Sequence, residues 1–223
     1  MRTIFVVLVL LMVAGVAAAA VQSAASPSLT VTVEPSKITA TGVSPGAQVL
    51  FFGEGFEPVK FHAVFHRWST VIQDTQHGTV SYVLDQPVTW NAVWIVADLR
   101  TGHYAIVSTP GFPIIRSDLA GRSLKHDASG AISRFVLSRM SADFLYVAPG
   151  GGAWSLLAQD GDANDADGSV NGETTIDLLR ASPVDGTDMA RQFSSGGTLF
   201  VIDPMRLDVL ELKLDGSILA GAR

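Results

Sequence analysis

The residues with the clearest potential for chemistry lie in one acidic stretch, Asp160–Glu173. It holds four aspartates, two asparagines, one glutamate and three glycines, with no cation. Calcium takes six to eight oxygen ligands, often from carboxylates spaced along one flexible loop. The sequence predicts a structural Ca²⁺ here, and a bare, solvated surface loop is the alternative that it leaves open. The predicted metal ligands are Asp160, Asp162, Asn164, Asp165 and Asp167.

Part of this stretch, Asp165-Ala-Asp167-Gly168-Ser-Val-Asn171, resembles the calcium loops of EF-hand and dockerin-type segments. The resemblance implies calcium binding. With Gly168 as the glycine of that pattern, however, the first ligand position falls on Ala163 and the closing acidic position on Thr174. A looser, aspartate-rich cage is therefore expected in place of an ordinary EF-hand.

Motifs for catalysis are missing from the sequence. It contains no G-x-S-x-G, no H-E-x-x-H, no phosphate-binding glycine loop and no cysteine, so we predict no enzymatic activity. His62 and His66 lie on an expected strand, about 13 Å apart at ~3.3 Å per residue, which is too far for one metal ion. We therefore expect two exposed histidines.

The N-terminus predicts export. Residues 1–20 have a short cationic lead, an apolar run and small residues, in the order of a secretory signal peptide, with cleavage as late as residue 25 as an alternative. A retained membrane anchor over residues 4–20 is the other reading. We expect a secreted, periplasmic or cell-surface protein that meets the membrane only during export. The net charge of −6 lacks the basic footprint of a nucleic-acid-binding protein.

Residues 27–112 predict an immunoglobulin-like β-sandwich. Apolar and polar residues alternate from Leu29 to Glu34, the first of about seven short strands with turns every 8–12 residues. Between them, we expect a turn over residues 53–58 and a strand over residues 59–66. Trp90 and Trp94 are expected on one strand face, as core residues.

Within this region, Pro45-Gly46-Ala-Gln-Val49-Leu-Phe51-Phe-Gly53-Glu-Gly55-Phe56 resembles the signature strand of bacterial immunoglobulin-like domains of the IPT/TIG type. The resemblance covers about a dozen residues and implies a binding or spacer module without catalytic residues. Such domains usually have a proline and a pair of glycines before that strand, and here only Pro45-Gly46 is found.

A break at residues 108–113, with two prolines and a glycine, separates a second, mainly β domain over residues 113–223. Strands are expected at residues 132–137, 144–147, 154–157, 174–179, 199–202 and 207–214, with a hairpin turn at Asp215-Gly216. The acidic loop, residues 160–173, joins two of these strands. The sequence thus predicts an all-β protein with two small β-sandwich-like domains after a signal peptide.

The functional expectation is a non-catalytic exported binding or structural protein, stabilised by calcium, with an unknown protein or glycan at the cell surface as its partner. Two alternatives stay open. One is a carbohydrate-binding module whose stacking residues would be Trp68, Trp90, Trp94 and Trp154. The other is a secreted hydrolase that uses Asp160, Asp162 or Asp165 around a catalytic metal.

Overall fold

The computed structural model describes residues 29–75, 77–114, 122–126, 132–137, 141–150, 152–177 and 197–213. The expected signal peptide and the Asp215-Gly216 turn lie outside these ranges. All regular secondary structure in the described residues is β-strand, which confirms the all-β class. Within the same ranges, the chain has no helix with the length and apolarity needed to traverse a bilayer.

The first half of the chain forms two antiparallel sheets. Their strands are β1 (Thr30–Glu34), β2 (Lys37–Thr41), β3 (Gln48–Val59), β4 (His62–Gln73), β5 (Thr79–Val83), β6 (Ala92–Asp98) and β7 (His103–Ser108). The strand orders are β1-β2-β5 and β4-β3-β6-β7. Ile38, Phe51 and Trp94 belong to one buried cluster between the two sheets, so this half is a β-sandwich.

The second half repeats this plan. Its strands are β8 (Arg122–His126), β9 (Ile132–Leu137), β10 (Ser141–Ala148), β11 (Gly152–Gln159), β12 (Thr174–Asp177), β13 (Thr198–Asp203) and β14 (Asp208–Lys213). A four-stranded sheet, β11-β10-β13-β14, packs against a three-stranded sheet, β12-β9-β8. Phe144, Ile176 and Leu212 lie in the buried cluster between them.

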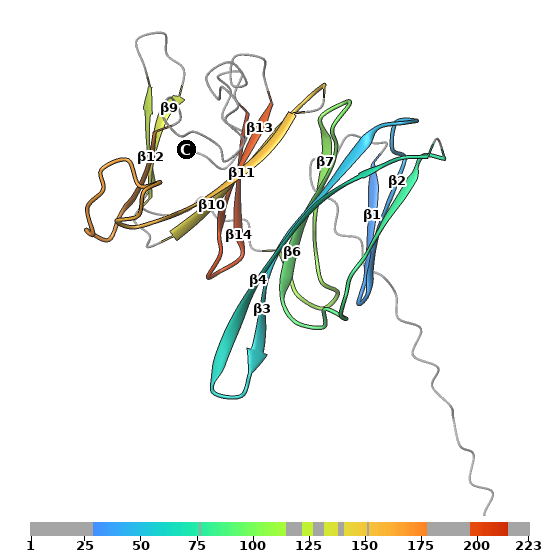
Figure 1. The fold of residues 1–223 in the computed structure, drawn as a ribbon, viewed down its shortest axis with the longest axis horizontal. Coiled ribbons are helices and arrows are strands. Elements are labelled where there is room, and N and C mark those ends of the chain that lie inside the picture. Colours follow the sequence, from blue (N-terminus) through green and yellow to red (C-terminus); the bar gives the residue numbers. More distant parts are fainter. Residues whose placement is uncertain are drawn as a thin grey trace, which may run out of the picture.

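The two sandwiches also share an interior. A third buried cluster joins Phe52 and Ile95 of the first sandwich to Leu145, Phe200 and Val209 of the second. The sheets therefore stack as four layers, which Figure 1 shows side by side from β12 and β9 to β1 and β2. The two four-stranded sheets are the central layers and are covered on both faces.

Strand sequences explain this arrangement. Every residue of β6 and of β13 is buried, and both strands have nearly continuous apolar sequences, as expected for strands covered on both faces. At the border of the shared interior, the Tyr104 hydroxyl on β7 donates to Glu211 Oε2 on β14 at 2.8 Å. The Tyr104 ring also meets the Phe200 ring edge-on, with centroids 4.8 Å apart.

The β3–β4 hairpin differs from the sequence prediction. The expected turn over residues 53–58 is wrong, because β3 continues to Val59 and the chain reverses at Lys60 and Phe61. Gly53 lies within the strand. It is a glycine there because the Trp94 ring occupies the space where a Cβ would lie. The glycines in this strand therefore make room for neighbours and do not turn the chain.

The same hairpin projects from the stack. β3 and β4 pair from Gln48–Gln73 at the base to Val59–His62 near the tip, without a register shift. In Figure 1 its tip, at the bottom of the view, extends beyond the two sandwiches. The tip is thus placed away from the packed layers.

Candidate functional site

The acidic loop lies between β11 and β12, as predicted. Its centre is Asp165, which is buried. The Asp165 carboxylate accepts hydrogen bonds from the backbone N–H of Gly161 at 2.8 Å and of Thr175 at 2.9 Å. Ala166 N–H donates to the Thr175 carbonyl at 2.7 Å. These contacts fold the loop back onto the start of β12.

The outer aspartates bind the loop's own backbone. Asp160 accepts from the N–H groups of Asn171 at 3.0 Å and Gly172 at 2.9 Å. Asp162 accepts from the N–H groups of Asn164 at 2.7 Å and Asp165 at 2.9 Å. Such side-chain-to-backbone bonds are the ordinary way in which aspartate stabilises turns.

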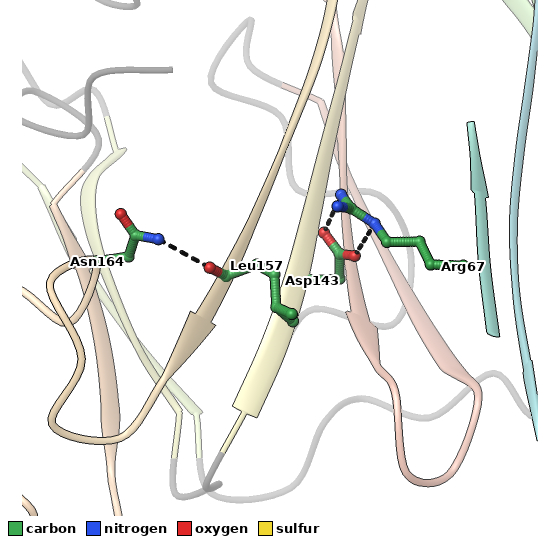
Figure 2. A network of polar contacts seen from close by, with 4 residues as sticks. All are labelled: Arg67, Asp143, Leu157 and Asn164. Carbon is green, nitrogen blue, oxygen red and sulfur yellow. Dashed lines mark hydrogen bonds and ion pairs between the residues drawn. The ribbon is translucent and has the colours of Figure 1, made fainter. Parts of the chain in front are cut away.

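Asn164 and Asp167 complete the loop. Asn164 Nδ2 donates to the carbonyl of Leu157 on β11 at 2.9 Å, which ties the loop to its preceding strand (Figure 2). Asp167 accepts from Ser169 N–H at 2.8 Å and from Asn171 Nδ2 at 3.2 Å. All five predicted ligands thus make hydrogen bonds that hold the loop in its conformation.

Metal binding is a separate question. Across the described ranges, which include the whole loop, no three His, Cys, Asp or Glu side chains are grouped to hold a metal ion. A carboxylate has about four lone-pair positions, so an aspartate with two amide bonds keeps acceptor capacity. Calcium binding at this loop stays a prediction.

A second polar group, which the sequence analysis missed, lies in the shared interior between the two central sheets. Glu54 on β3 and Asp143 on β10 are both fully buried, with 0% exposure. Arg67 lies opposite Glu54 in the β3–β4 pairing, on the edge strand β4. The available signal was a carboxylate inside an apolar run in each strand, which is rare unless the group is paired.

Arg67 reaches across the layers to Asp143. Its Nε lies 2.7 Å from Asp143 Oδ2 and its Nη2 donates to Asp143 Oδ1 at 3.1 Å, so the pair is bidentate (Figure 2). The Arg67 guanidinium also lies over the Phe52 ring, 5.2 Å from its centroid. The planar guanidinium suits both contacts. Arg67 thus links the two sandwiches by an ion pair, in addition to the apolar packing of the third buried cluster.

Glu54 has no such cation of its own. Neither of its oxygens has a hydrogen-bond donor among the described N–H groups. Burial raises the pKa of Glu54 well above 4.5, the neighbouring Asp143 carboxyl raises it further, and Arg67 acts in the opposite direction. Burial also raises the pKa of Asp143, against the lowering effects of Glu54 and Arg67. Among the described residues, Arg67 is the cation that lowers the pKa of both carboxyls, and it is bonded to Asp143, so protonation is favoured on Glu54.

The two histidines are not a metal pair. His62 is exposed near the hairpin tip, whereas His66 is half-buried, so the expectation that both are exposed is wrong for His66. His66 Nε2 lies 2.9 Å from Glu57 Oε2, and its ring stacks on Trp68 with centroids 5.5 Å apart. Gly55 lies opposite His66, and a Cβ at Gly55 would meet Ala92 of β6.

The four tryptophans are packed against protein. Trp94 and Trp154 are buried, which confirms the core interpretation for Trp94. Trp68 and Trp90 are half-buried and pack against the core of the first sandwich. Trp90 precedes β6 and does not lie on that strand.

A surface cavity of about 620 Å³ lies at the turn between β1 and β2. Val33, Pro35, Val88 and Pro110 are among its lining residues. None of the five predicted metal ligands and none of the three groups of the Glu54–Asp143–Arg67 set lines it. It is therefore separate from both candidate sites.

No protein-family model matches the chain, and no curated protein matches it.

Proposed function

We propose that the protein is a non-catalytic, exported binding protein, secreted or held at the cell surface, in which the stacked sandwiches present the β3–β4 hairpin to a partner. The observation that carries this proposal is the state of Phe61 at the hairpin tip. Its side chain is 94% exposed. Its backbone has φ +75°, a left-handed value that is unusual for a bulky residue. Strained positions of this kind cluster at ligand-contact sites.

The hairpin is stiffened behind its tip. On one face, the Phe56 and Phe65 rings lie 5.4 Å apart. On the other face, Glu57 and His66 form their 2.9 Å contact. Side-chain pairs across both faces stabilise a two-stranded ribbon. Phe61 therefore lies at the end of a rigid hairpin, and a rigid hairpin loses less conformational entropy on binding a partner.

The chemistry of the tip suggests the kind of partner. Residues 58–63 are all exposed and contain no acidic side chain. Phe61 and Val59 supply apolar surface, and the Lys60 ammonium lies 5.3 Å from the Phe61 ring centroid. An apolar pocket bordered by acidic groups on a cell-surface protein fits this tip best, since an aromatic anchor in a pocket is a common binding hot spot.

Neither alternative function gains a specific observation. The carbohydrate-binding alternative takes the four tryptophans as its stacking residues, and none of the four is exposed. The hydrolase alternative uses Asp160, Asp162 or Asp165 around a catalytic metal, and each of these carboxylates accepts hydrogen bonds from the loop's own backbone amides.

The test is retention of the fluorescently labelled protein on intact cells of the producing organism. Phe61→Ser should reduce binding at least tenfold, while Met205→Ser, a matched change of an exposed apolar residue on the second sandwich, should leave it unchanged. Both variants should unfold at the wild-type temperature. Wild-type binding by Phe61→Ser, or no binding by the wild-type protein, would contradict the proposal.

A further inference from the structure

Strand β4 is the outer strand of a central sheet. The strand order β4-β3-β6-β7 leaves it bonded to β3 on one side, and the described residues place no strand on its other side. It runs from His62 to Gln73, twice the length of a typical strand of about 5–6 residues. An outer strand presents N–H and C=O groups that can pair with another chain.

Three usual protections of an outer strand, proline, lysine and a bulge, are missing from β4. Its sequence has no proline and no lysine, and its pairing with β3 contains no bulge. By contrast β8, an outer strand of the second sandwich, contains a lysine and has a register shift at Lys125–His126. Proline, lysine and bulges are among the devices that keep outer strands from associating. Arg67, the one arginine of β4, is already paired with Asp143. In β4 the apolar Val71 is 47% exposed instead.

We propose that two copies of the chain associate through β4, antiparallel and about a twofold axis at Trp68, to form one continuous eight-stranded sheet. Residues opposite each other in an antiparallel pair share a face of the sheet, so the axis must pass through a residue position. An axis at Trp68 pairs residues 63–73 of one copy with residues 73–63 of the other. The interface is isologous, as closed dimers require.

This register is self-complementary. It places Val71 opposite the partner copy's Phe65, and Ile72 opposite its Val64. Arg67 falls opposite Ser69, and His66 opposite Thr70, so no like charges face each other directly. Each apolar pair occurs twice by symmetry. Apolar cross-strand pairs are the favourable ones in sheets, and the exposed face of Val71 becomes covered.

The neighbouring register is worse. An axis at Arg67 would set two guanidinium groups opposite each other and would pair Phe65 with Ser69. Like charges directly opposite each other destabilise a strand pair. Pairing about Trp68 also leaves Phe61 outside the paired residues. The proposal rests on the sheet edge alone and does not depend on the function proposed for the hairpin tip.

Sedimentation equilibrium of the full chain tests the association. We expect a reversible monomer–dimer equilibrium. Val71→Lys should raise the dimer dissociation constant at least tenfold, because a charge then faces the partner's Phe65. Val83→Lys, at an exposed valine of β5, should leave that constant unchanged. A wild-type protein that stays monomeric at high micromolar concentration, or equal effects of the two variants, would overturn the proposal.

Introduced single cysteines test the register. The sequence contains no cysteine of its own, so each introduced cysteine is the only thiol in its variant. In the proposed dimer, residue 69 lies diagonally from its own copy, about 7–8 Å away between Cα atoms. Residue 63 lies ten positions from its copy, about 33 Å at ~3.3 Å per residue. A short bismaleimide should therefore crosslink Ser69→Cys and not Ala63→Cys. The reverse pattern, or equal crosslinking, would contradict this register.

Discussion

Arg67 and Asp143 connect the two central sheets by a bidentate ion pair, with Nε–Oδ2 at 2.7 Å and Nη2–Oδ1 at 3.1 Å. The two residues are 76 positions apart in the sequence. Asp143 is fully buried, while the Arg67 side chain is 32% exposed. Solvent therefore reaches the Arg67 guanidinium and not the Asp143 carboxylate. Loss of the guanidinium would leave a buried carboxylate without a counter-charge.

Replacing Arg67 with methionine should destabilise the protein. Breaking a buried pair costs about 3–5 kcal/mol, and solvent near Arg67 should reduce the loss to about 2–3 kcal/mol. Urea unfolding at neutral pH measures it. In an Asp143→Asn background the same change should cost much less, because no buried charge is left behind. Equal losses in both backgrounds would contradict the pairing.

Stability should fall as the pH rises above about 4.5, because the folded state holds a proton on Glu54. The pKa of Glu54 is raised in the folded protein, as is that of Asp143. Their contribution is therefore complete below the unfolded pKa values and is lost as the pH passes the folded ones. Each proton involved changes stability by about 1.4 kcal/mol per pH unit.

Glu54→Gln should remove much of this dependence. The amide cannot ionise, so the variant should be more stable than wild type at pH 8 and similar to it at pH 4. Urea unfolding of both proteins over pH 4–9 measures the difference. The lowered pKa of Asp98 acts only in the acid range and should be unaffected. Parallel pH profiles for the two proteins would contradict the assignment.

Gly53→Ala should destabilise the first sandwich, because its Cβ would meet the Trp94 ring. Overpacking of this kind costs about 1–3 kcal/mol. Gly152→Ala is the matched control, since a Cβ there would lie 3.4 Å from Ala148 Cβ, close to ordinary contact. Thermal unfolding compares the two variants. Equal stability of both would show that the Trp94 ring moves away at no cost.

Calcium should stabilise the protein if the acidic loop binds it. At a hundred times the dissociation constant, a ligand adds about 2.7 kcal/mol, which raises the unfolding temperature by several degrees. The measurement is thermal unfolding with calcium, with magnesium and with a chelator. Asp160→Asn together with Asp167→Asn should abolish the shift. An unchanged temperature at millimolar calcium would contradict the prediction.

The sequence was sufficient for most strands, because alternation and turn residues are local signals. Residues 132–137 were predicted with the bounds of β9. The predicted strand is shorter than β3 because Gly53 and Gly55 resemble turn residues. Both are glycines because Trp94 and Ala92, which lie far along the chain, occupy the space of their Cβ atoms. The Glu54–Asp143–Arg67 set could not be assembled from the sequence for the same reason. Each carboxylate in an apolar strand is a local signal, but only the stacking of the two sandwiches brings these residues together.

The two sandwiches share one interior and should therefore unfold as one unit. Scanning calorimetry at pH 6 tests this most directly. We expect a single transition whose calorimetric and van't Hoff enthalpies agree, in the wild-type protein and in Glu54→Gln. Two separate transitions in the wild-type protein, one for each sandwich, would contradict it.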